Sequence, residues 1–141
     1  MSGLEFLRAI RDGRVPPAPM AELLGFRLLT VEPGEVAFEV VPRKEHYNPI
    51  GTVHGGLAMT LLDSAMACSV HTHLAPGVGY TTVEAKINLV RPISAETGRL
   101  RALGKTIHVG SRIATAEGRL VDDAGKLYAH GTTTCIVLNG R

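Results

Sequence analysis

Two glycines and one aspartate in the segment NPIGTVHGGLAMTLLD, residues 48–63, have the types and spacing for acyl-transfer chemistry. Gly55 and Gly56 stand at the expected first turn of a helix, where backbone N–H groups have no acceptor within the helix. Because glycine has no Cβ, a ligand oxygen can approach these amides closely, at the positive end of the helix dipole. Such donors polarise a carbonyl and stabilise its tetrahedral oxyanion. The alternative is an ordinary glycine-rich junction between loop and helix.

Asp63 lies inside the apolar run that follows, where a buried carboxylate needs a partner or a function. Asp63 comes eight residues after Gly55, which is ~12 Å along a helix that rises ~1.5 Å per residue. One carboxylate therefore cannot serve a carbonyl bound at its own Gly55. We expect it to come from a second subunit, whose helix packs alongside in the opposite direction. The alternative is a structural aspartate bonded to Thr60 or Ser64.

The elements that position these residues follow from hydrophobic periodicity. Residues 57–74 have the length and composition of one long helix, apolar on most of its circumference, which must be wrapped by other elements. Short helical turns are predicted before Gly13 and Gly25. Period-two alternation predicts a hairpin before the long helix and further strands after it. The strand candidates are FRLLTVE, EVAFEVV, YTTVEAKINLV, GRLRALGKTIHVG, RIATAEGRLVD and KLYAHGTTTCIVL.

This order of elements predicts an α+β fold, with an antiparallel sheet wrapped around the long helix. Because the later strands follow one another through short connections, we expect them to form a meander. In residues 82–89 the alternation puts Val83, Ala85, Ile87 and Leu89 on one face, and Thr82, Glu84, Lys86 and Asn88 on the other. An open sheet leaves an edge strand, so we expect pairing with a second copy and at least a dimer.

Composition limits the class of protein. A chain of 141 residues with 45% hydrophobic and 20% charged residues is expected to form one folded unit, with a helical segment at 1–25 and a single domain at 26–141. A net charge of +2 argues against a nucleic-acid binder. We find no signal peptide and no apolar run of about 18 residues, so no membrane partner is expected. Cys68 and Cys135 lack a motif, which favours free thiols and a cytoplasmic location.

The sequence gives little support to a metal site, a serine nucleophile or a nucleotide-binding loop. His71 and His73 are two residues apart and would not converge on one helix face, so no metal site is expected. The sequence contains no nucleophile elbow around a serine. The one G-x-G, at residues 77–79, precedes a strand, which indicates a turn and not a nucleotide-binding loop.

Several segments together resemble the hotdog-fold acyl-CoA thioesterases, and within them the phenylacetate-degradation (PaaI-like) type. These segments are HYNPIGTVHGGLAMTLLD at 46–63, TVEAKINLVRP at 82–92, GKTIHVGSR at 104–112 and GKLYAHGTTT at 125–134. The resemblance covers roughly residues 23–137, and the N-x-x-G-x-x-H-G-G-(7)-D pattern is its most specific part.

The resemblance implies hydrolysis of an aryl or medium-chain acyl-CoA to a free acid and CoA by a homodimer or a dimer of dimers. It implies no cofactor, because CoA is part of the substrate and thioesters carry a good leaving group. Gly55 would donate its N–H to the thioester carbonyl, and Asp63 of the partner subunit would be the general base or the nucleophile. The remaining roles fall on Asn48, which would orient water or the acyl carbonyl, on His54, which would brace the loop, and on Thr82, near the attacking water.

Substrate contacts are expected at Gly56 and at Met59, which lies where pocket depth would be set. Arg91, Lys105 and Arg112 are candidates for the phosphates of CoA, with surface solvation as the alternative for each. Two further functions stay open. One is a hotdog hydratase or dehydratase acting on acyl thioesters through a histidine, and the other is a non-catalytic acyl-CoA-binding module.

Overall fold

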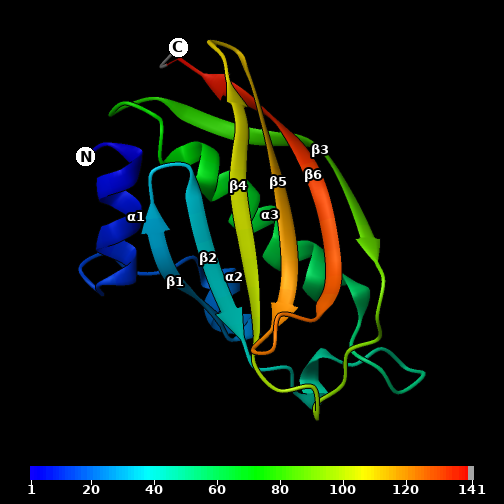
Figure 1. Ribbon diagram of the computed structural model, residues 1–141. Coiled ribbons are helices and arrows are strands. Elements are labelled where there is room, and N and C mark those ends of the chain that lie inside the picture. The colour runs from blue at the N-terminus through cyan, green and yellow to red at the C-terminus, as the bar shows by residue number, and fades with distance from the viewer. Residues whose placement is uncertain (140–141) are drawn as a thin grey trace.

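The computed structural model describes residues 1–139 and contains one antiparallel sheet in the order β1-β2-β4-β5-β6-β3 (Figure 1). The strands are β1 Phe26–Glu32, β2 Glu35–Val40, β3 Gly79–Leu89, β4 Leu100–Val109, β5 Ile113–Asp122 and β6 Leu127–Leu138. The helices are α1 Gly3–Arg11, α2 Pro19–Leu24 and α3 Gly55–His71, with a short 3₁₀ turn η1 at Lys44–His46. The predicted α+β fold with one long helix against an antiparallel sheet is confirmed.

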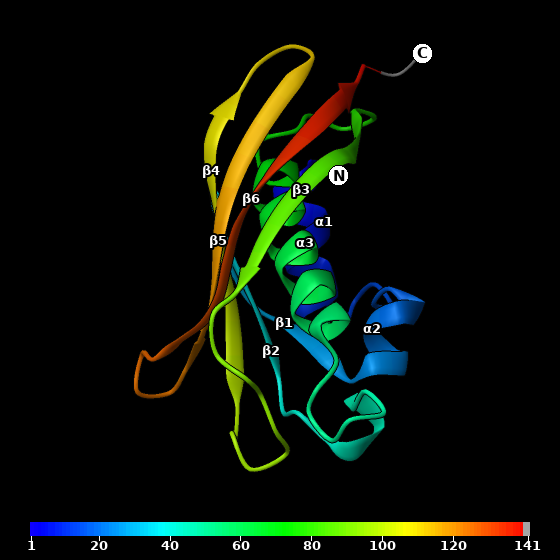
Figure 2. The ribbon, with the colours of Figure 1, turned by 90° about the vertical axis from the view of Figure 1, so that its right-hand side faces the viewer.

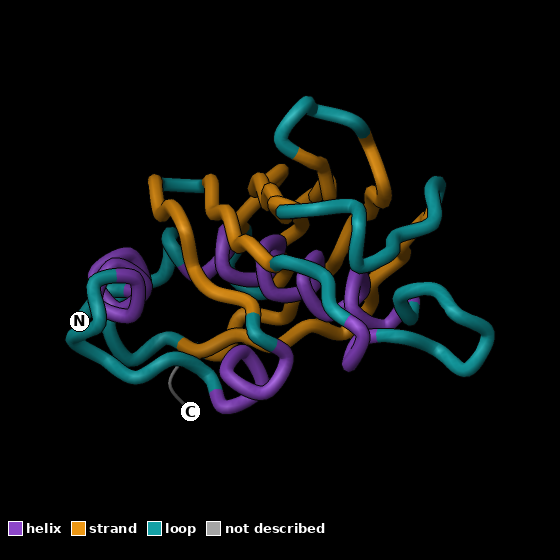
Figure 3. The backbone as a smooth tube through the Cα atoms, turned by 90° about the horizontal axis from the view of Figure 1, so that it is seen from below, coloured by secondary structure: helices purple, strands orange, loops and turns teal. Residues whose placement is uncertain are grey.

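Helix α3 lies against one face of the sheet, and α1 and α2 lie on the same side (Figure 2). Seen from below, the strands curve around the central helix (Figure 3). Glycines in the sheet allow this close approach. A Cβ on Gly104 would lie 2.1 Å from the Ala65 carbonyl oxygen, and one on Gly118 would lie 2.9 Å from Cγ of Met66. Because Gly104 and Gly118 are register partners, they open one strip of the sheet to the helix backbone.

The N-terminal helices close the β1 side of this layer. The N–H of Gly3 donates to the Leu74 carbonyl just beyond α3 (3.0 Å), and the Arg8 side chain donates to the Val31 carbonyl on β1 (3.2 Å). Helix α2 ends at Gly25, whose φ of 78° is the left-handed conformation that glycine adopts without strain. Both predicted helical turns are present. The β1 edge is therefore covered by α1.

The predicted meander is only partly correct. Strands β4, β5 and β6 do follow one another, but β3 pairs with β6 at the far edge, and β4 pairs with β2. The connection between β3 and β4 crosses from one side of the sheet to the other, passing the loop before α3, where the Val53 N–H donates to the Ile93 carbonyl (2.9 Å). The lengths of the connections did not predict this strand order, because β2 and β4 are far apart in the sequence and pair only in the folded sheet.

The predicted face of Thr82 is wrong, because β3 contains a bulge. Its pairing with β6 shifts between Thr82 and Glu84, so that Thr82 opposes the buried Cys135 and Glu84 opposes Thr134. A bulge adds one residue and reverses the alternation around it. Thr82 therefore faces α3, on the same side as Ala85 and Ile87.

None of the helices within residues 1–139 is long and apolar enough to cross a membrane. Cys68 and Cys135 are both free thiols, as predicted.

Candidate active site

The first turn of α3 holds one engaged and one available backbone donor. His54 is the N-cap residue, and its Nδ1 accepts a hydrogen bond from the Gly56 N–H (2.8 Å). This bond uses one of the free amides of the first turn. Within residues 1–139, the Gly55 N–H has no acceptor. The structure thus places His54 beneath the turn and leaves Gly55, not Gly56, able to donate to a ligand.

Asn48 organises the loop before α3. Its Oδ1 accepts from the N–H groups of Ile50 and Thr52 (3.1 and 3.2 Å), and its Nδ2 donates to the Thr52 hydroxyl (3.0 Å). The side chain is therefore engaged within its own turn, as asparagine side chains often are. Asn48 therefore stabilises the loop that precedes Gly55, and its predicted role toward water or the acyl carbonyl stays a prediction.

Asp63 is half-buried on α3 and is paired with a strand residue. The Thr82 hydroxyl donates to Asp63 Oδ1 at 2.9 Å, so the partner is Thr82 and neither Thr60 nor Ser64. The bulge in β3 is what turns Thr82 toward the helix. One carboxylate oxygen is thereby held by a side-chain hydrogen bond.

The neighbours of Asp63 are weak acids that stay protonated at neutral pH. Burial raises the pKa of the Cys68 thiol to about 12, and the charge of Asp63 adds to this rise. Burial also raises the pKa of the Tyr80 phenol and of the Cys135 thiol. Only a thiolate is an effective cysteine nucleophile, so neither thiol fits that role. Among these neighbouring groups Asp63 is the carboxylate, and its predicted role as base or nucleophile stays a prediction at this point.

Asp63 and Thr82 line a cavity of about 1070 Å³ between α3 and the N-terminal helices. Sequence reasoning missed this cavity, because residues of α1, α2 and β1 form much of its wall. The sequence carried only a weak indication of it, because the small residues Ser64, Ala67 and Cys68 recur along α3 at spacings of three and four residues.

The Gly55 and Asp63 ends of α3 are not brought together within one chain. They lie on the same helix, ~12 Å apart along its axis. Met59 lies between them and is exposed, while the side chains of Leu61 and Leu62 are fully buried against the sheet. Beside this open helix face runs the edge strand β3, whose Val83 and Leu89 are also exposed.

The two arginines predicted to bind substrate lie at opposite ends of the sheet. Arg91 follows β3 near Gly55, where its Nε donates to the Leu127 carbonyl (3.3 Å) and its guanidinium lies over the Tyr128 ring. Arg112 precedes β5 at the other end, and its carbonyl accepts from the Val137 N–H. The two arginines therefore do not converge on one position, and substrate binding by either stays a prediction.

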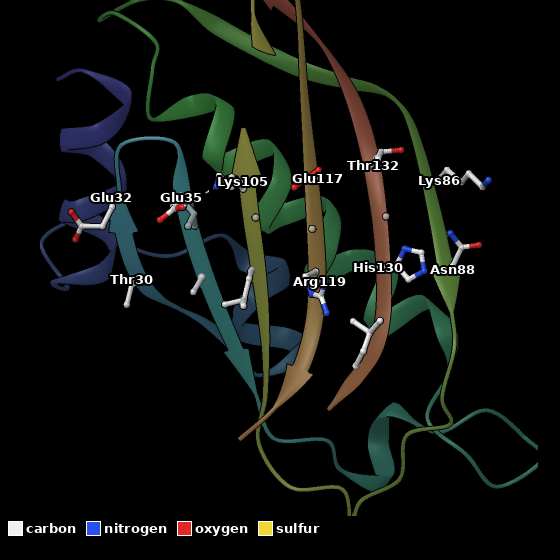
Figure 4. Close-up of a pocket in the computed structure, with 17 residues that line it drawn as sticks. Thr30, Glu32, Glu35, Lys86, Asn88, Lys105, Glu117, Arg119, His130 and Thr132 are labelled. Carbon is white, nitrogen blue, oxygen red and sulfur yellow. Dashed lines mark ion pairs between the residues drawn. The ribbon is translucent and has the colours of Figure 1, made fainter. Parts of the chain in front are cut away.

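A second cavity of about 800 Å³ lies on the outer face of the sheet, away from α3 (Figure 4). Charged side chains from several strands line it, and Lys105 pairs with Glu35 across neighbouring strands (3.8 Å). On the same face Glu39 is buried, yet hydrogen bonds from Arg27 and Arg99 lower its pKa. Asp63 lies in the wall of the other cavity, on the α3 side of the sheet.

No group of three or more His, Cys, Asp or Glu side chains that could hold a metal ion occurs within residues 1–139. His71, at the end of α3, instead packs between aromatic rings, 5.7 Å from Phe6 and 4.7 Å from Tyr80 between centroids. Burial there lowers its pKa.

The chain is similar in sequence to several hydrolases. It is 38% identical to human acyl-coenzyme A thioesterase 13 over 76% of each chain. It is 27% identical to a putative esterase of Archaeoglobus fulgidus, over 96% of this chain and 85% of that one.

Solved structures share the fold. A putative thioesterase of Ralstonia eutropha, described as related to phenylacetic acid degradation, superposes with a TM-score of 0.82 at 29% identity, covering 92% of this chain and 98% of that chain. A variant of the phenylacetic acid degradation protein PaaI of Thermus thermophilus gives a TM-score of 0.75 at 32% identity, over 84% and 98%. These neighbours and the architecture confirm the predicted hotdog fold and its PaaI-like type. The model of the thioesterase superfamily matches residues 50–129, from the loop before Gly55 to β6, and the chain therefore belongs to the thioesterase superfamily.

Proposed function

We propose that the protein hydrolyses acyl-CoA thioesters at two equivalent sites, each formed across the interface of a homodimer. The observation that carries the proposal is the Asp63–Thr82 pair at the wall of an apolar cavity, on the same helix that presents the unbonded Gly55 N–H. Similarity to the human acyl-coenzyme A thioesterase supports acyl-CoA as the substrate class.

The chemistry needs one donor and one carboxylate. The thioester carbonyl accepts a hydrogen bond from Gly55 of one subunit, which stabilises the oxyanion as the carbonyl carbon becomes tetrahedral. Asp63 of the other subunit takes a proton from water, and the resulting hydroxide adds to that carbon. The C–S bond then breaks, the CoA thiolate takes up the proton, and the free acid remains. Thr82 holds the carboxylate in place through its hydroxyl.

Asp63 could also attack the carbonyl carbon itself and form an anhydride that water then opens. A single turnover in ¹⁸O-labelled water separates the two routes. If water opens the anhydride at the Asp63 carboxyl carbon, the first acid released carries an unlabelled oxygen of Asp63 and the label enters Asp63. Direct attack of water on the thioester places the label in the acid and none in Asp63, so a label found in Asp63 identifies the covalent route.

The dimer is proposed to form along β3. This strand lies at the uncovered edge of the sheet, and an exposed edge that carries apolar side chains favours pairing with another copy. A two-fold axis there would place Gly55 of one copy beside Asp63 of the other twice. Ala85→Asp would put a charge on this exposed edge in both copies. We expect it to give monomers by light scattering and to abolish hydrolysis, while Val41→Asp, at an exposed site away from β3, should change neither.

The direct test measures thiol release from phenylacetyl-, benzoyl- and medium-chain acyl-CoAs. The wild-type protein should hydrolyse at least one of these substrates, and Asp63→Asn should lose about 10²–10⁴-fold in kcat. Full activity in Asp63→Asn would refute the assigned role. A monomer that still hydrolysed thioesters would refute the cross-subunit site.

A further inference from the structure

We infer that the cavity beneath α1 and α2 is the acyl pocket, and that the N-terminal segment makes the enzyme selective for long-chain or fused-ring apolar acyl groups. This inference rests on the proposed function, because it places the thioester carbonyl at Asp63. It adds a pocket contained within one protomer and a role for residues 1–25.

The volume of the cavity suits a large acyl group. At about 1070 Å³ it lies at the upper end of the range for pockets that enclose drug-sized ligands, about 300–1000 Å³. A cavity of about 150 Å³ is enough to bind one benzene ring. A benzoyl or phenylacetyl group would therefore leave most of the space unfilled, whereas a long alkyl chain or a fused ring system could contact all the walls.

The side chains of α3 that face the cavity are small beyond Asp63. Ser64, Ala67 and Cys68 line it. Ala67 lies one turn after Asp63, and Cys68 lies one turn after Ser64, so the two rows run side by side along the helix. His71 comes one turn after Ala67 and closes that row. The small residues leave a channel that starts at the carboxylate and runs along α3 toward α1.

The opposite walls are apolar and aromatic. All three phenylalanines of the chain line this cavity, together with Tyr80. Phe26 and Phe38 contact edge to face with centroids 5.6 Å apart, which fixes their orientation. Phe6, on α1, lies over His71. Aromatic walls of this kind bind apolar groups and exclude water.

The N-terminal helices form the outer wall of the cavity. Phe6 of α1 and Met20 of α2 line it, although 38% and 52% of their respective surfaces remain exposed. Apart from Asp63, the charged lining residues are Arg11, Glu22 and Arg27, which are all exposed and mark the rim that opens to solvent. The pocket therefore has a reactive end at Asp63 and a solvent rim at α2, with apolar walls between them.

The test fills or opens the cavity away from the reacting atoms. Ala67→Leu adds apolar volume to the α3 side, and we expect kcat/KM for lauroyl-CoA to fall at least about tenfold, because pockets commonly discriminate that strongly over a few methylenes. Activity on butyryl-CoA should stay within about threefold of wild type, because a short acyl group ends before Ala67. The ratio of kcat/KM for lauroyl-CoA to kcat/KM for butyryl-CoA does not depend on the amount of folded protein, so it corrects for any loss of folding.

A second variant acts from the other wall. Phe6→Ala removes an aromatic contact from α1 without adding bulk. It should also lower kcat/KM for lauroyl-CoA more than kcat/KM for butyryl-CoA. Leu23→Ala is the matched control, because Leu23 is 75% exposed on α2 and does not line the cavity. If the ratio of kcat/KM for lauroyl-CoA to kcat/KM for butyryl-CoA is unchanged in both Ala67→Leu and Phe6→Ala, the inference is overturned.

Binding of laurate, measured by calorimetry, separates this inference from the proposed function. If wild type binds laurate and Ala67→Leu weakens that binding, the pocket stands even when no thioester is hydrolysed. If thioesters are hydrolysed but laurate binds wild type and Ala67→Leu equally, the hydrolase stands and the pocket assignment fails.

Discussion

The two ends of the proposed site on α3 are built in different ways. At Asp63 the carboxylate is half-buried, bonded to Thr82 and set in the wall of a large cavity of its own chain. At Gly55 the backbone donor stands at the helix start beside an exposed loop, with Leu89 of the edge strand as its near neighbour. One end has a pocket and no oxyanion donor, and the other has a donor and no carboxylate.

This difference is the reason for proposing that the site is shared between two chains. Helix rise keeps the two groups apart, and no bending of a continuous helix would bring them to one carbonyl. Each end has what the other lacks, so an antiparallel copy of the same helix would complete both. The following predictions test whether the two ends are halves of one site.

Removing the donor at the Gly55 end should have the largest effect. Gly55→Pro deletes the N–H but suits the first helical position, and the His54 backbone (φ −61°, ψ 133°) is already of the kind required before proline. We expect kcat to fall about 10²–10³-fold, the loss typical for one oxyanion donor. Gly55→Ala is the matched control, because it keeps the N–H, and its Cβ meets only the flexible end of Leu89. Equal losses in both variants would point to crowding and not to the donor.

Mixing two inactive variants should restore activity if the halves belong to different chains. Equal amounts of Asp63→Asn and Gly55→Pro subunits, unfolded and refolded together, should regain roughly a quarter of wild-type activity, because about half of the dimers are mixed and each holds one intact site. The measurement is thiol release before and after co-refolding. If activity stays at the level of the separate variants, both groups act within one chain or at different sites.

At the Asp63 end, loss of the Thr82 hydroxyl should have a smaller effect. Thr82→Val keeps the shape and the strand preference but leaves Asp63 Oδ1 without its donor. We expect kcat to fall about tenfold, in line with a hydrogen bond to a charged group, while Thr82→Ser, which keeps the hydroxyl, should stay close to wild type. The contrast between the two variants in kcat is the readout, and a similar loss in both would mean that packing of the methyl group matters more.

The smallest effect concerns the pH dependence of stability near the cavity. Burial lowers the pKa of His71 below its ordinary 6.5, so the folded state resists protonation. As the pH falls through about 6.5, the unfolded chain takes up a proton that the folded chain does not, and stability falls with pH. Urea unfolding between pH 7.5 and 5.5 should show that the free energy of unfolding falls less with decreasing pH in His71→Gln than in wild type. An identical pH slope in the two proteins would contradict this assignment.

Much of the local structure was predictable because it depends on neighbours in sequence. The length of α3 and the β1–β2 hairpin follow from the hydrophobic periodicity of the sequence. The placement of Gly55 in the first turn also followed from the break between the polar loop and the apolar run. The family was recognisable from the same segment, since its pattern carries the residues that the chemistry needs.

The wrong predictions concern features that depend on pairing between segments far apart in the sequence. The bulge that turns Thr82 toward Asp63 exists only in the pairing of β3 with β6, and a regular alternation cannot reveal it. The position of β3 at the sheet edge likewise depends on β4 pairing with β2. The cavity was missed for the same reason, because α1, α2, β1 and α3 enclose it only after they pack.

The sequence by itself determined the fold class, the family and the distance between Gly55 and Asp63, because helix rise is a local property of the backbone. The tertiary structure alone decided which hydroxyl holds Asp63 and which face of α3 stays open. It also decided that the N-terminal segment closes a cavity beside the carboxylate. Those features depend on contacts between residues far apart in the chain, and such contacts are set by the packing of the whole sheet around α3.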